Sequence, residues 1–362
     1  MRPVARNLAA VAIAMAIAAG AATAAPPLPQ LPRLNIEPGG ITVSGLSAGG
    51  YMATQLELSH SALVRGAGIF AAGPWFCARG SLLRALGECL NRASSTPQVG
   101  ELVEAARQAA ATAAIDTPSN LAAHRVFMLR GALDDRIARP VSDALAEFYR
   151  AFVPAANFRY VTDVPVAHGV PTRASGTACG TTATPYLNAC GYDGVGQMLA
   201  FLYGGALVPP APAAPPAPAT ATEASGAGGG AAAGAAVAPR AGLQRFGQRR
   251  YDAAGSLATT GYLYLPAACL RGAPCRLHVA LHGCRQSADF VGEAFVREAG
   301  YNGWAEANRI VVLYPQVGAS WLLPFNPQGC WDFWGYTGAD YATRNGTQVR
   351  ALRVLLQALA GA

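Results

Sequence analysis

A serine between two glycines joins a strand-like run to a helix-forming run near the start of the chain, and this feature constrains the fold most. The pattern G-x-S-x-G occupies residues 45–49, with its serine at Ser47, after the β-branched, apolar residues 41–43 and before the helix-forming residues 51–58. A glycine-rich turn is the alternative in a chain with 41 glycines. The strand–turn–helix setting favours a nucleophile elbow, in which the serine Oγ stands clear of a sheet. Glycines suit it because a Cβ would clash where the helix passes the strand.

A serine nucleophile needs a general base, and the chain has five histidines. His168 is the best candidate, because it follows a predicted strand in segment 166–172, whose glycine and proline indicate a loop. A histidine with a purely structural role is the alternative. His278 lies inside a predicted strand, and His60 and His124 lie in or next to helical or polar segments.

The base needs a carboxylate to orient it, and Asp134 is the candidate. It follows closely on the predicted strand 126–129, and open α/β sheets place functional loops at the carboxyl ends of strands. Asp135 is a close rival for this role, and whichever of the two aspartates does not orient the histidine is expected to be a solvated charge in the loop. Asp163 is less suited, since it lies only a few residues before His168 on the same strand end. The resulting order, serine then aspartate then histidine, is that of α/β-hydrolases.

The same chemistry needs backbone N–H groups that stabilise a developing oxyanion. The amide of Ala48, directly after the candidate nucleophile, is the first. The second commonly comes from a loop after an early strand, often with a His-Gly motif. The motif His282-Gly283-Cys284 follows the predicted strand 277–281 and fits this role, but it comes late in the chain.

One stretch with almost no large apolar side chains divides the chain. Residues 208–241 are rich in Pro, Ala and Gly, which predicts a flexible linker. Two domains are the simple inference, but strand and helix signals alternate on both sides, in 25–207 and in 242–362, and neither side has enough strands for a doubly covered sheet. We therefore predict one α/β-hydrolase domain built from both parts, with a mostly parallel sheet and helices on both faces. The predicted strands are 41–43, 67–72, 126–129, 158–161, 261–265, 277–281 and 310–314, and the predicted helices are 51–58, 143–152, 294–308 and 346–359.

The first residues carry the pattern of an export signal. Arg2 and Arg6 precede an apolar run over 8–22, and residues 22–24 form a small-residue cleavage pattern, so residues 1–24 are expected to be a removed signal peptide. A retained membrane helix is the alternative, but the run is short and rich in alanine. We expect a secreted protein, extracellular or periplasmic, without membrane association after cleavage.

Eight cysteines agree with an oxidising compartment. Roughly a hundred pairings are possible. Our hypothesis joins the cysteines that are neighbours in the chain and then pairs the two cysteines that remain. The sequence has no C-x-x-C motif and no histidine at ligand spacing beside the cysteine pairs, so a zinc site is not expected. The hypothetical pairs are Cys77–Cys89, Cys179–Cys190, Cys269–Cys275 and Cys284–Cys330.

The basic residues are all arginines, because the chain contains no lysine. This excludes Ser-Lys catalysis and P-loop phosphate binding. The formal net charge is +7, and loss of Arg2 and Arg6 leaves 7 − 2 = +5. The arginines are scattered and are not interleaved with aromatic residues, so nucleic-acid binding is not expected.

Together these motifs resemble those of a known family. The chain has the serine box, G-x-x-D-x-x-[IV] at 131–137, the His168 loop, a cysteine-bearing motif over 179–194 and Leu-His-Gly-Cys at 281–284. Their combination and order are similar to those of extracellular poly(3-hydroxybutyrate) depolymerases with the circularly permuted, type 2, catalytic domain.

The resemblance covers nearly all of 34–205 and 243–340 and implies specific site residues. The implied triad is Ser47, Asp134 and His168, and the implied oxyanion hole is the backbone amides of Ala48 and Cys284. Segment 330–335 resembles the family's aromatic region near the active-site crevice. The substrate-binding candidates are Trp331, Trp334, Tyr51 and His282, with Phe325 and Trp321 as further members of an apolar groove; core packing is the alternative for each aromatic residue.

The expected function is a serine esterase that cleaves poly(3-hydroxybutyrate) or its oligomers through an acyl-enzyme, without a cofactor or metal. A feruloyl or acetyl-xylan esterase is the nearest rival, and a catalytically silent polymer-binding protein is the alternative from another class. Many family members carry a separate polymer-binding domain after the catalytic one, and none follows residue 362 here. Soluble oligomers or amorphous granules are therefore the expected substrates.

The late oxyanion motif predicts where the chain ends lie. In an unpermuted hydrolase, the helix 346–359 would lead into the strand before the elbow. Joining residue 362 to residue 34 restores that order, so we predict that these two regions lie close together and that the linker spans the original ends.

Overall fold

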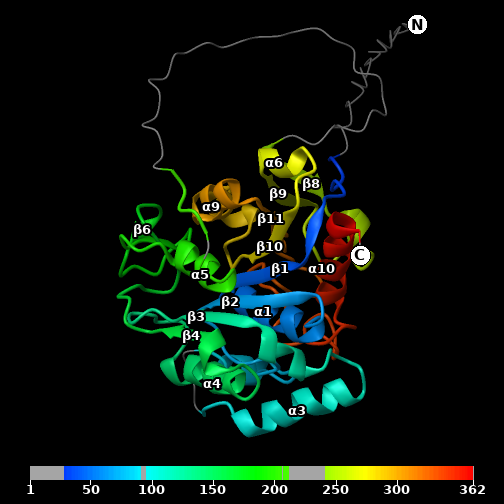
Figure 1. Cartoon of the computed structure of the whole chain (residues 1–362). Coiled ribbons are helices and arrows are strands. Elements are labelled where there is room, and N and C mark those ends of the chain that lie inside the picture. The colour runs from blue at the N-terminus through cyan, green and yellow to red at the C-terminus, as the bar shows by residue number, and fades with distance from the viewer. Residues whose placement is uncertain (1–27, 91–94, 206, 212–240, 362) are drawn as a thin grey trace, which may run out of the picture.

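One sheet of eight strands forms the centre of the part of the chain that the computed structural model describes, residues 28–90, 95–205, 207–211 and 241–361 (Figure 1). The pairings from β4 to β11 are parallel, and the last two, β11 with β9 and β9 with β8, are antiparallel. The prediction of a mostly parallel sheet is therefore confirmed. In spatial order the strands are β4 (Phe158–Val161), β3 (Arg125–Leu129), β2 (Val64–Phe70), β1 (Ile36–Leu46), β10 (Cys275–Leu281), β11 (Ile310–Tyr314), β9 (Thr260–Leu265) and β8 (Gly242–Gly247).

The two parts of the chain meet in the middle of this sheet. β1 from the first part pairs with β10 from the second, with Thr42 opposite His278 and Ser44 opposite Ala280. Val43 is fully buried, as apolar residues of central parallel strands usually are. Strands from both sides of the predicted linker thus form one hydrogen-bonded sheet.

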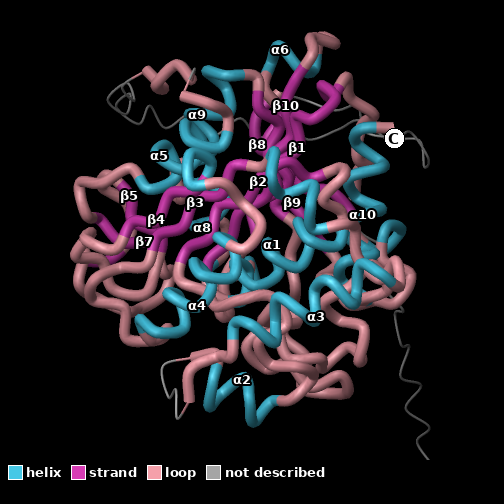
Figure 2. Tube along the Cα trace, turned by 60° about the horizontal axis from the view of Figure 1, so that its bottom comes forward, coloured by secondary structure: helices cyan, strands magenta, loops and turns pink. Residues whose placement is uncertain are grey.

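Helices cover both faces of the sheet (Figures 1 and 2). On one face, the β1 side chains Thr42 and Ser44 bond to Tyr203, at the end of α5, and to Tyr301, at the start of α9. On the other face α1 packs with α10 and α4. The helices are α1 (Ala48–Ser59), α2 (Leu82–Glu88), α3 (Val99–Ala111), α4 (Arg139–Arg150), α5 (Gly194–Leu202), α6 (Ala267–Leu270), α7 (Ala288–Val291), α8 (Ala294–Glu298), α9 (Tyr301–Asn308) and α10 (Thr347–Ala360), with short 3₁₀ turns at Pro118–Ala123, Ala155–Asn157 and Arg249–Tyr251.

One predicted helix is broken. The region 294–308 forms two helices, α8 and α9, because Gly300 between them takes a left-handed backbone conformation with φ of 99°. Glycine reaches this conformation without a steric penalty, so it interrupts a helix easily. After this turn α9 starts at Tyr301, and the ring of Tyr301 is buried against the sheet.

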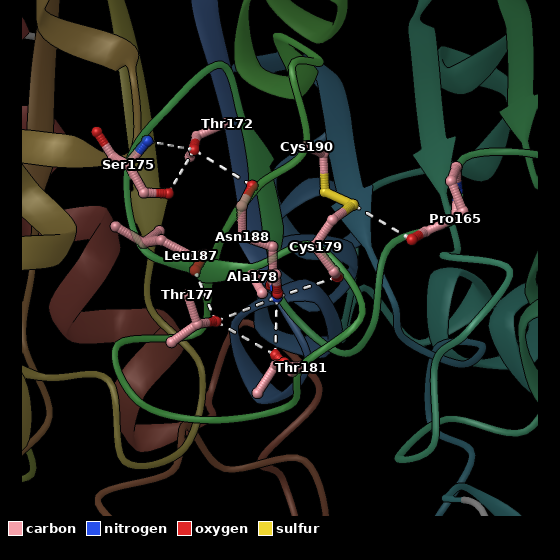
Figure 3. The surroundings of a disulfide bond; sticks show 10 residues. All are labelled: Pro165, Thr172, Ser175, Thr177, Ala178, Cys179, Thr181, Leu187, Asn188 and Cys190. Carbon is pink, nitrogen blue, oxygen red and sulfur yellow. Dashed lines mark hydrogen bonds between the residues drawn. A yellow bond between two sulfur atoms is a disulfide. The ribbon is translucent and has the colours of Figure 1, made fainter.

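A small second sheet follows the candidate base and is closed by a disulfide (Figure 3). It consists of β5 (Val170–Thr172), β7 (Leu187–Ala189) and β6 (Thr177–Ala178). The bond Cys179–Cys190 ties its ends, and the side-chain amide of Asn188 donates to the carbonyls of Ala178, Cys179 and Thr181. The segment after His168 is thereby held in a fixed shape.

All four predicted cysteine pairs are present as disulfides, and the described residues contain no free cysteine. Three of them close loops of 6 to 12 residues. The fourth, Cys284–Cys330, spans 46 residues and links the loop after β10 to the aromatic segment. Joining the neighbouring cysteines first and then the remaining two therefore gave the correct pairs.

The beginning and end of the described chain lie side by side. The amide of Leu34 donates to the carbonyl of Leu359 at 2.8 Å, and the Arg33 guanidinium donates to Gly361 at 3.4 Å. This confirms the prediction made from the permuted motif order. The predicted signal peptide, 1–24, and most of the predicted linker, 208–241, lie outside the described residues. Among those described, no helix is both long and apolar enough to cross a membrane.

Candidate active site

Ser47 occupies the turn between β1 and α1 in a strained backbone conformation, with φ of 55°. Its N–H donates to the carbonyl of Phe70 in β2 at 2.9 Å, which helps to hold the turn. A Cβ on Gly45 would lie 2.8 Å from a backbone nitrogen of α1, and a Cβ on Gly49 would lie 2.8 Å from the carbonyl carbon of Leu281. The glycines at the two ends of the pentapeptide therefore follow from close backbone packing.

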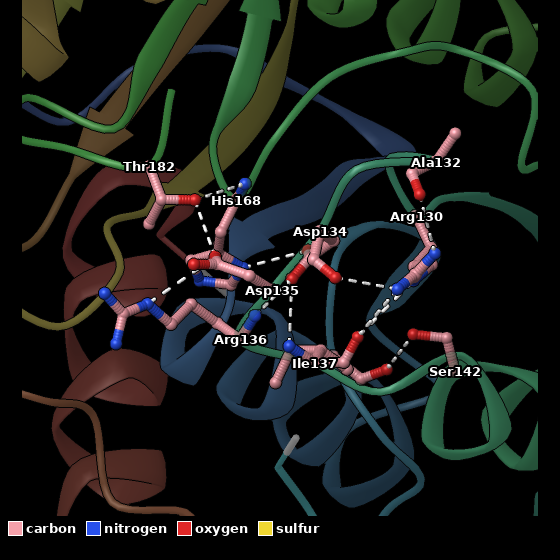
Figure 4. Close-up of polar contacts among 10 residues, drawn as sticks. Arg130, Ala132, Asp134, Asp135, Arg136, Ile137, Ser142, His168 and Thr182 are labelled. Atoms are coloured by element: carbon pink, nitrogen blue, oxygen red, sulfur yellow. Dashed lines mark hydrogen bonds and ion pairs between the residues drawn. The ribbon is translucent and has the colours of Figure 1, made fainter. Parts of the chain in front are cut away.

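Asp134 and His168 form a buried hydrogen-bonded pair (Figure 4). The Nδ1 of His168 lies 2.9 Å from Asp134 Oδ2, and the other carboxylate oxygen accepts the N–H groups of Arg136 at 2.8 Å and Ile137 at 2.9 Å. Burial alone would raise the pKa of Asp134, but the charge and hydrogen bond of His168 and the two backbone N–H groups outweigh it and lower this pKa. The aspartate is thus ionised at neutral pH and oriented toward the imidazole.

The two adjacent carboxylates play different parts. The Asp134 side chain is fully buried, whereas that of Asp135 is 57% exposed. Asp135 accepts a 2.6 Å hydrogen bond from the Thr182 hydroxyl, whose oxygen in turn accepts the backbone N–H of His168 at 3.1 Å. Asp163, the third candidate, is exposed. The geometry therefore favours Asp134 as the partner of His168.

Ser47 and His168 line the same pocket, which has a volume of about 590 Å³. Its other walls come from α2, from the loop after β10 and from the aromatic segment near Trp334. The apolar part includes Leu82, Leu86 and Phe333. A candidate nucleophile and a candidate base thus face a largely apolar cavity.

The loop after β10 lies against the elbow and offers one unused amide. The N–H of Gly283 donates to Gln286 Oε1 at 2.8 Å, and that of Arg285 donates to the Gln328 carbonyl at 2.7 Å. Between them, the N–H of Cys284 has no recorded partner among the described residues. Ala48 is the first residue of α1, where helical N–H groups lack a partner within the helix. Both amides therefore remain candidates for the oxyanion hole.

The structure corrects three of the four predicted substrate-binding residues. Trp331 and His282 have no exposed surface, Tyr51 is 2% exposed, and none of the three lines the pocket. Their rings are used in packing: Tyr51 stacks on Phe333, and Trp331 packs beside His282. Core packing, the alternative considered for the aromatic residues, is the role observed.

Two of the aromatic predictions have a place near the pocket. Trp334 lines the pocket. Of the two further groove candidates, Phe325 also lines it, whereas Trp321 is 75% exposed and does not. The buried carboxylate of Asp332 accepts four consecutive backbone N–H groups, those of residues 334–337, and so fixes the loop that carries Trp334.

His282 has a structural role in the oxyanion loop. Its Nδ1–H donates to the Gly283 carbonyl at 2.8 Å, and its Nε2 accepts the N–H of Val317 at 3.0 Å. Burial lowers its pKa to about 4, although the hydrogen bond to Gly283 opposes this. The imidazole is therefore neutral near pH 7 and connects the loop to the end of β11.

Sequence reasoning missed Gln286, a fully buried side chain that joins two walls of the site. Its Oε1 accepts the N–H of Gly283, while its Nε2 donates to the carbonyls of Pro185 at 2.9 Å and Tyr186 at 3.2 Å. Tyr186 lines the pocket with its ring edge-on to His168. A lone glutamine near a loop carries no motif that would have revealed this.

The described residues contain no group of three or more His, Cys, Asp or Glu side chains able to hold a metal ion. What the site does contain is a serine on a strand–turn–helix elbow and a buried aspartate–histidine pair, on a mostly parallel sheet. This arrangement defines the class of the protein as a serine hydrolase with a circularly permuted α/β-hydrolase fold.

Comparison with known proteins gives the family. The chain is 37% identical over 330 residues to the poly(3-hydroxybutyrate) depolymerase of Delftia acidovorans, a match that covers 90% of this chain and 61% of that protein. It is 33% identical over 355 residues to the polyhydroxybutyrate depolymerase of Talaromyces funiculosus, covering 94% and 95% of the two chains. The chain belongs to the poly(3-hydroxybutyrate) depolymerase family. No protein-family model matches it.

Two solved structures are similar. One is a PHB depolymerase with a serine-to-alanine substitution, complexed with an R3HB trimer (TM-score 0.78, 31% identity). The other is the PHB depolymerase from Penicillium funiculosum (TM-score 0.76, 32% identity). Each match covers 91% of this chain and 98% of the solved one.

Proposed function

We propose that this protein hydrolyses ester bonds of poly(3-hydroxybutyrate) or its oligomers, with Ser47 as nucleophile, His168 as general base and acid, and Asp134 as the group that orients the imidazole. The observation that carries the proposal is the common pocket of Ser47 and His168, with His168 bonded to the ionised Asp134. The family relationship supports the same assignment.

The reaction proceeds in two halves. Because the Asp134 carboxylate accepts a hydrogen bond from Nδ1–H of His168, Nε2 is the nitrogen that takes the proton of Ser47 as its Oγ attacks the ester carbonyl. The amides of Ala48 and Cys284 bind the oxyanion. His168 then protonates the leaving alcohol, and a water molecule, activated by the same imidazole, hydrolyses the acyl-enzyme.

The surroundings of the pocket suit an apolar, methyl-bearing polyester. Leu82, Leu86 and Phe325 line it and are each about half exposed, and Leu83, on the same helix as the two leucines, is 83% exposed. Large apolar side chains gathered on a surface commonly mark a binding site for an apolar partner. A feruloyl or acetyl-xylan esterase would instead have to accommodate a carbohydrate beside this apolar rim.

Export is part of the proposal. The leader pattern at 1–24 supports secretion, and four disulfides with no free cysteine among the described residues suit an oxidising compartment.

The test is a substrate panel with the wild type and Ser47→Ala. We expect the wild type to release 3-hydroxybutyrate or short oligomers from amorphous polymer or from the 3-hydroxybutyrate trimer, and Ser47→Ala to release none above background. Release of ferulate or xylan-bound acetate at a higher kcat/KM than that for the trimer would favour the carbohydrate-esterase alternative. Absence of turnover on every ester, with the protein folded and bound to polymer granules, would favour a silent binding protein.

A further inference from the structure

Two arginines stand in the wall of the candidate active site. Among the described residues that line the pocket, two carry a permanent charge, Arg136 and Arg285, and no aspartate or glutamate is present. A neutral polyester chain gives no reason for two guanidinium groups there. A free carboxylate does, and each polyester chain of hydroxy acids ends in one.

Arg136 lines the pocket together with His168, and its side chain lies near that histidine (Figure 4). Its backbone N–H donates to Asp134, and its Nε lies 3.6 Å from Asp135 Oδ1. Asp135 accepts a hydrogen bond from the Thr182 hydroxyl, whose oxygen accepts the backbone N–H of His168. These contacts place the Arg136 side chain near His168, with its guanidinium mostly exposed to solvent.

The direction of the reaction places a carboxylate on this same side. When the last ester bond of an oligomer is cleaved, the Ser47 Oγ–acyl bond forms and the bond from the acyl carbon to the ester oxygen breaks. The proton taken from Ser47 passes through His168 to that oxygen. The leaving alcohol is a 3-hydroxy acid that carries the terminal carboxylate, so this carboxylate departs from the side of His168.

We propose that Arg136 binds the terminal carboxylate of an oligomer on the leaving-group side and makes the site prefer free-acid chain ends; this rests on the esterase function proposed above. The two terminal nitrogens of a guanidinium match the two oxygens of a carboxylate.

The experiment uses two substrates with one ester bond each: the 3-hydroxybutyrate dimer as the free acid and the same dimer with a terminal amide. The measured quantity is the ratio of their kcat/KM values. Because the Arg136 side chain is 60% exposed, the effect is moderate. We expect Arg136→Gln to lower the acid-to-amide ratio about fivefold, and added salt to lower the wild-type ratio by screening.

Arg139→Gln is the matched control. Arg139 is 64% exposed, pairs with Asp143 and does not line the pocket, so its loss removes the same charge nearby and should leave the ratio unchanged.

Three results would overturn the proposal. The first is an unchanged ratio in Arg136→Gln, and the second is an equal fall in Arg139→Gln, which would indicate a nonspecific charge effect. The third is a fall in Arg285→Gln alone, which would move carboxylate binding to the other side of the pocket. Failure of the esterase function itself is distinct, because the wild type would then hydrolyse neither the amide-capped dimer nor amorphous polymer.

Discussion

Replacing Asp134 by asparagine is expected to disable the site without unfolding the protein. Asp134 Oδ1 accepts the N–H groups of Arg136 and Ile137, at 2.8 and 2.9 Å, and Oδ2 faces His168 Nδ1. In the variant these two donors keep the carbonyl oxygen of the asparagine at the Oδ1 position, so its NH₂ group turns toward His168. The imidazole must then present an acceptor at Nδ1 and carry its proton on Nε2, where it can no longer accept the proton of Ser47.

The corresponding change in a serine-protease triad lowers kcat by about 10⁴, which is about 5.5 kcal/mol of transition-state stabilisation. We expect a loss of this order in Asp134→Asn, measured as kcat on a soluble 3-hydroxybutyrate oligomer at pH 7, with thermal unfolding as the check on folding. Asp163→Asn is the matched control at an exposed position, with kcat expected within about twofold of wild type. A folded Asp134→Asn protein that loses less than about tenfold would refute the tautomer argument.

Three further predictions concern buried polar groups. Gln286→Glu keeps the acceptor for the oxyanion loop but turns a carboxylate toward two carbonyls, so kcat should fall about 10- to 100-fold with a smaller change in KM. His124→Ala leaves the fully buried Glu57 without its imidazole partner, and urea unfolding should show a loss of about 3–5 kcal/mol. Burial lowers the pKa of His278 to about 3 and of His282 to about 4, so each should remove up to about 1.4 kcal/mol of stability per pH unit as pH falls from about 6.5 toward 4.

Each of these has a contradicting result. Gln248 has the same hydrogen-bond pattern as Gln286, one backbone N–H accepted and two carbonyls contacted, at a place away from the pocket. An equal fall of kcat in folded Gln248→Glu would show that Gln286 has no special link to catalysis. A loss below about 1 kcal/mol in His124→Ala would contradict the buried-pair argument. The acid prediction has this sign because only the unfolded chain takes up the protons; constant stability between pH 6.5 and 4 would contradict it.

The sequence predicted those features that depend on backbone geometry and chain order. The elbow at Ser47 can be recognised in the sequence because Gly45 and Gly49 lie so close to neighbouring backbone that a residue with a Cβ would clash there. Asp134 was found because it follows a strand end, with the adjacent Asp135 left as a close rival, and the burial of Asp134 favours it. The position of His282-Gly283-Cys284 late in the chain predicted a permuted sheet in which residue 34 lies near the last helix, and Leu34 is hydrogen-bonded to Leu359.

Side-chain exposure was less predictable. Trp331 and Trp334 are three residues apart in one aromatic segment, yet the first is in the core and the second lines the pocket. The difference arises from the turn that Asp332 stabilises through backbone N–H groups, a tertiary feature without a sequence pattern. Gln286 was missed for a similar reason, because its partners come from a loop about 100 residues away.

The central claim is that Ser47 is the nucleophile of one site assembled from both parts of the chain. Its most direct test is covalent labelling by an active-site phosphonate, read by intact mass and by peptide mapping. We predict one label per chain, on the peptide that contains Ser47, with no labelling of Ser47→Ala. A label on another serine, or undiminished labelling of a folded Ser47→Ala protein, would contradict the account.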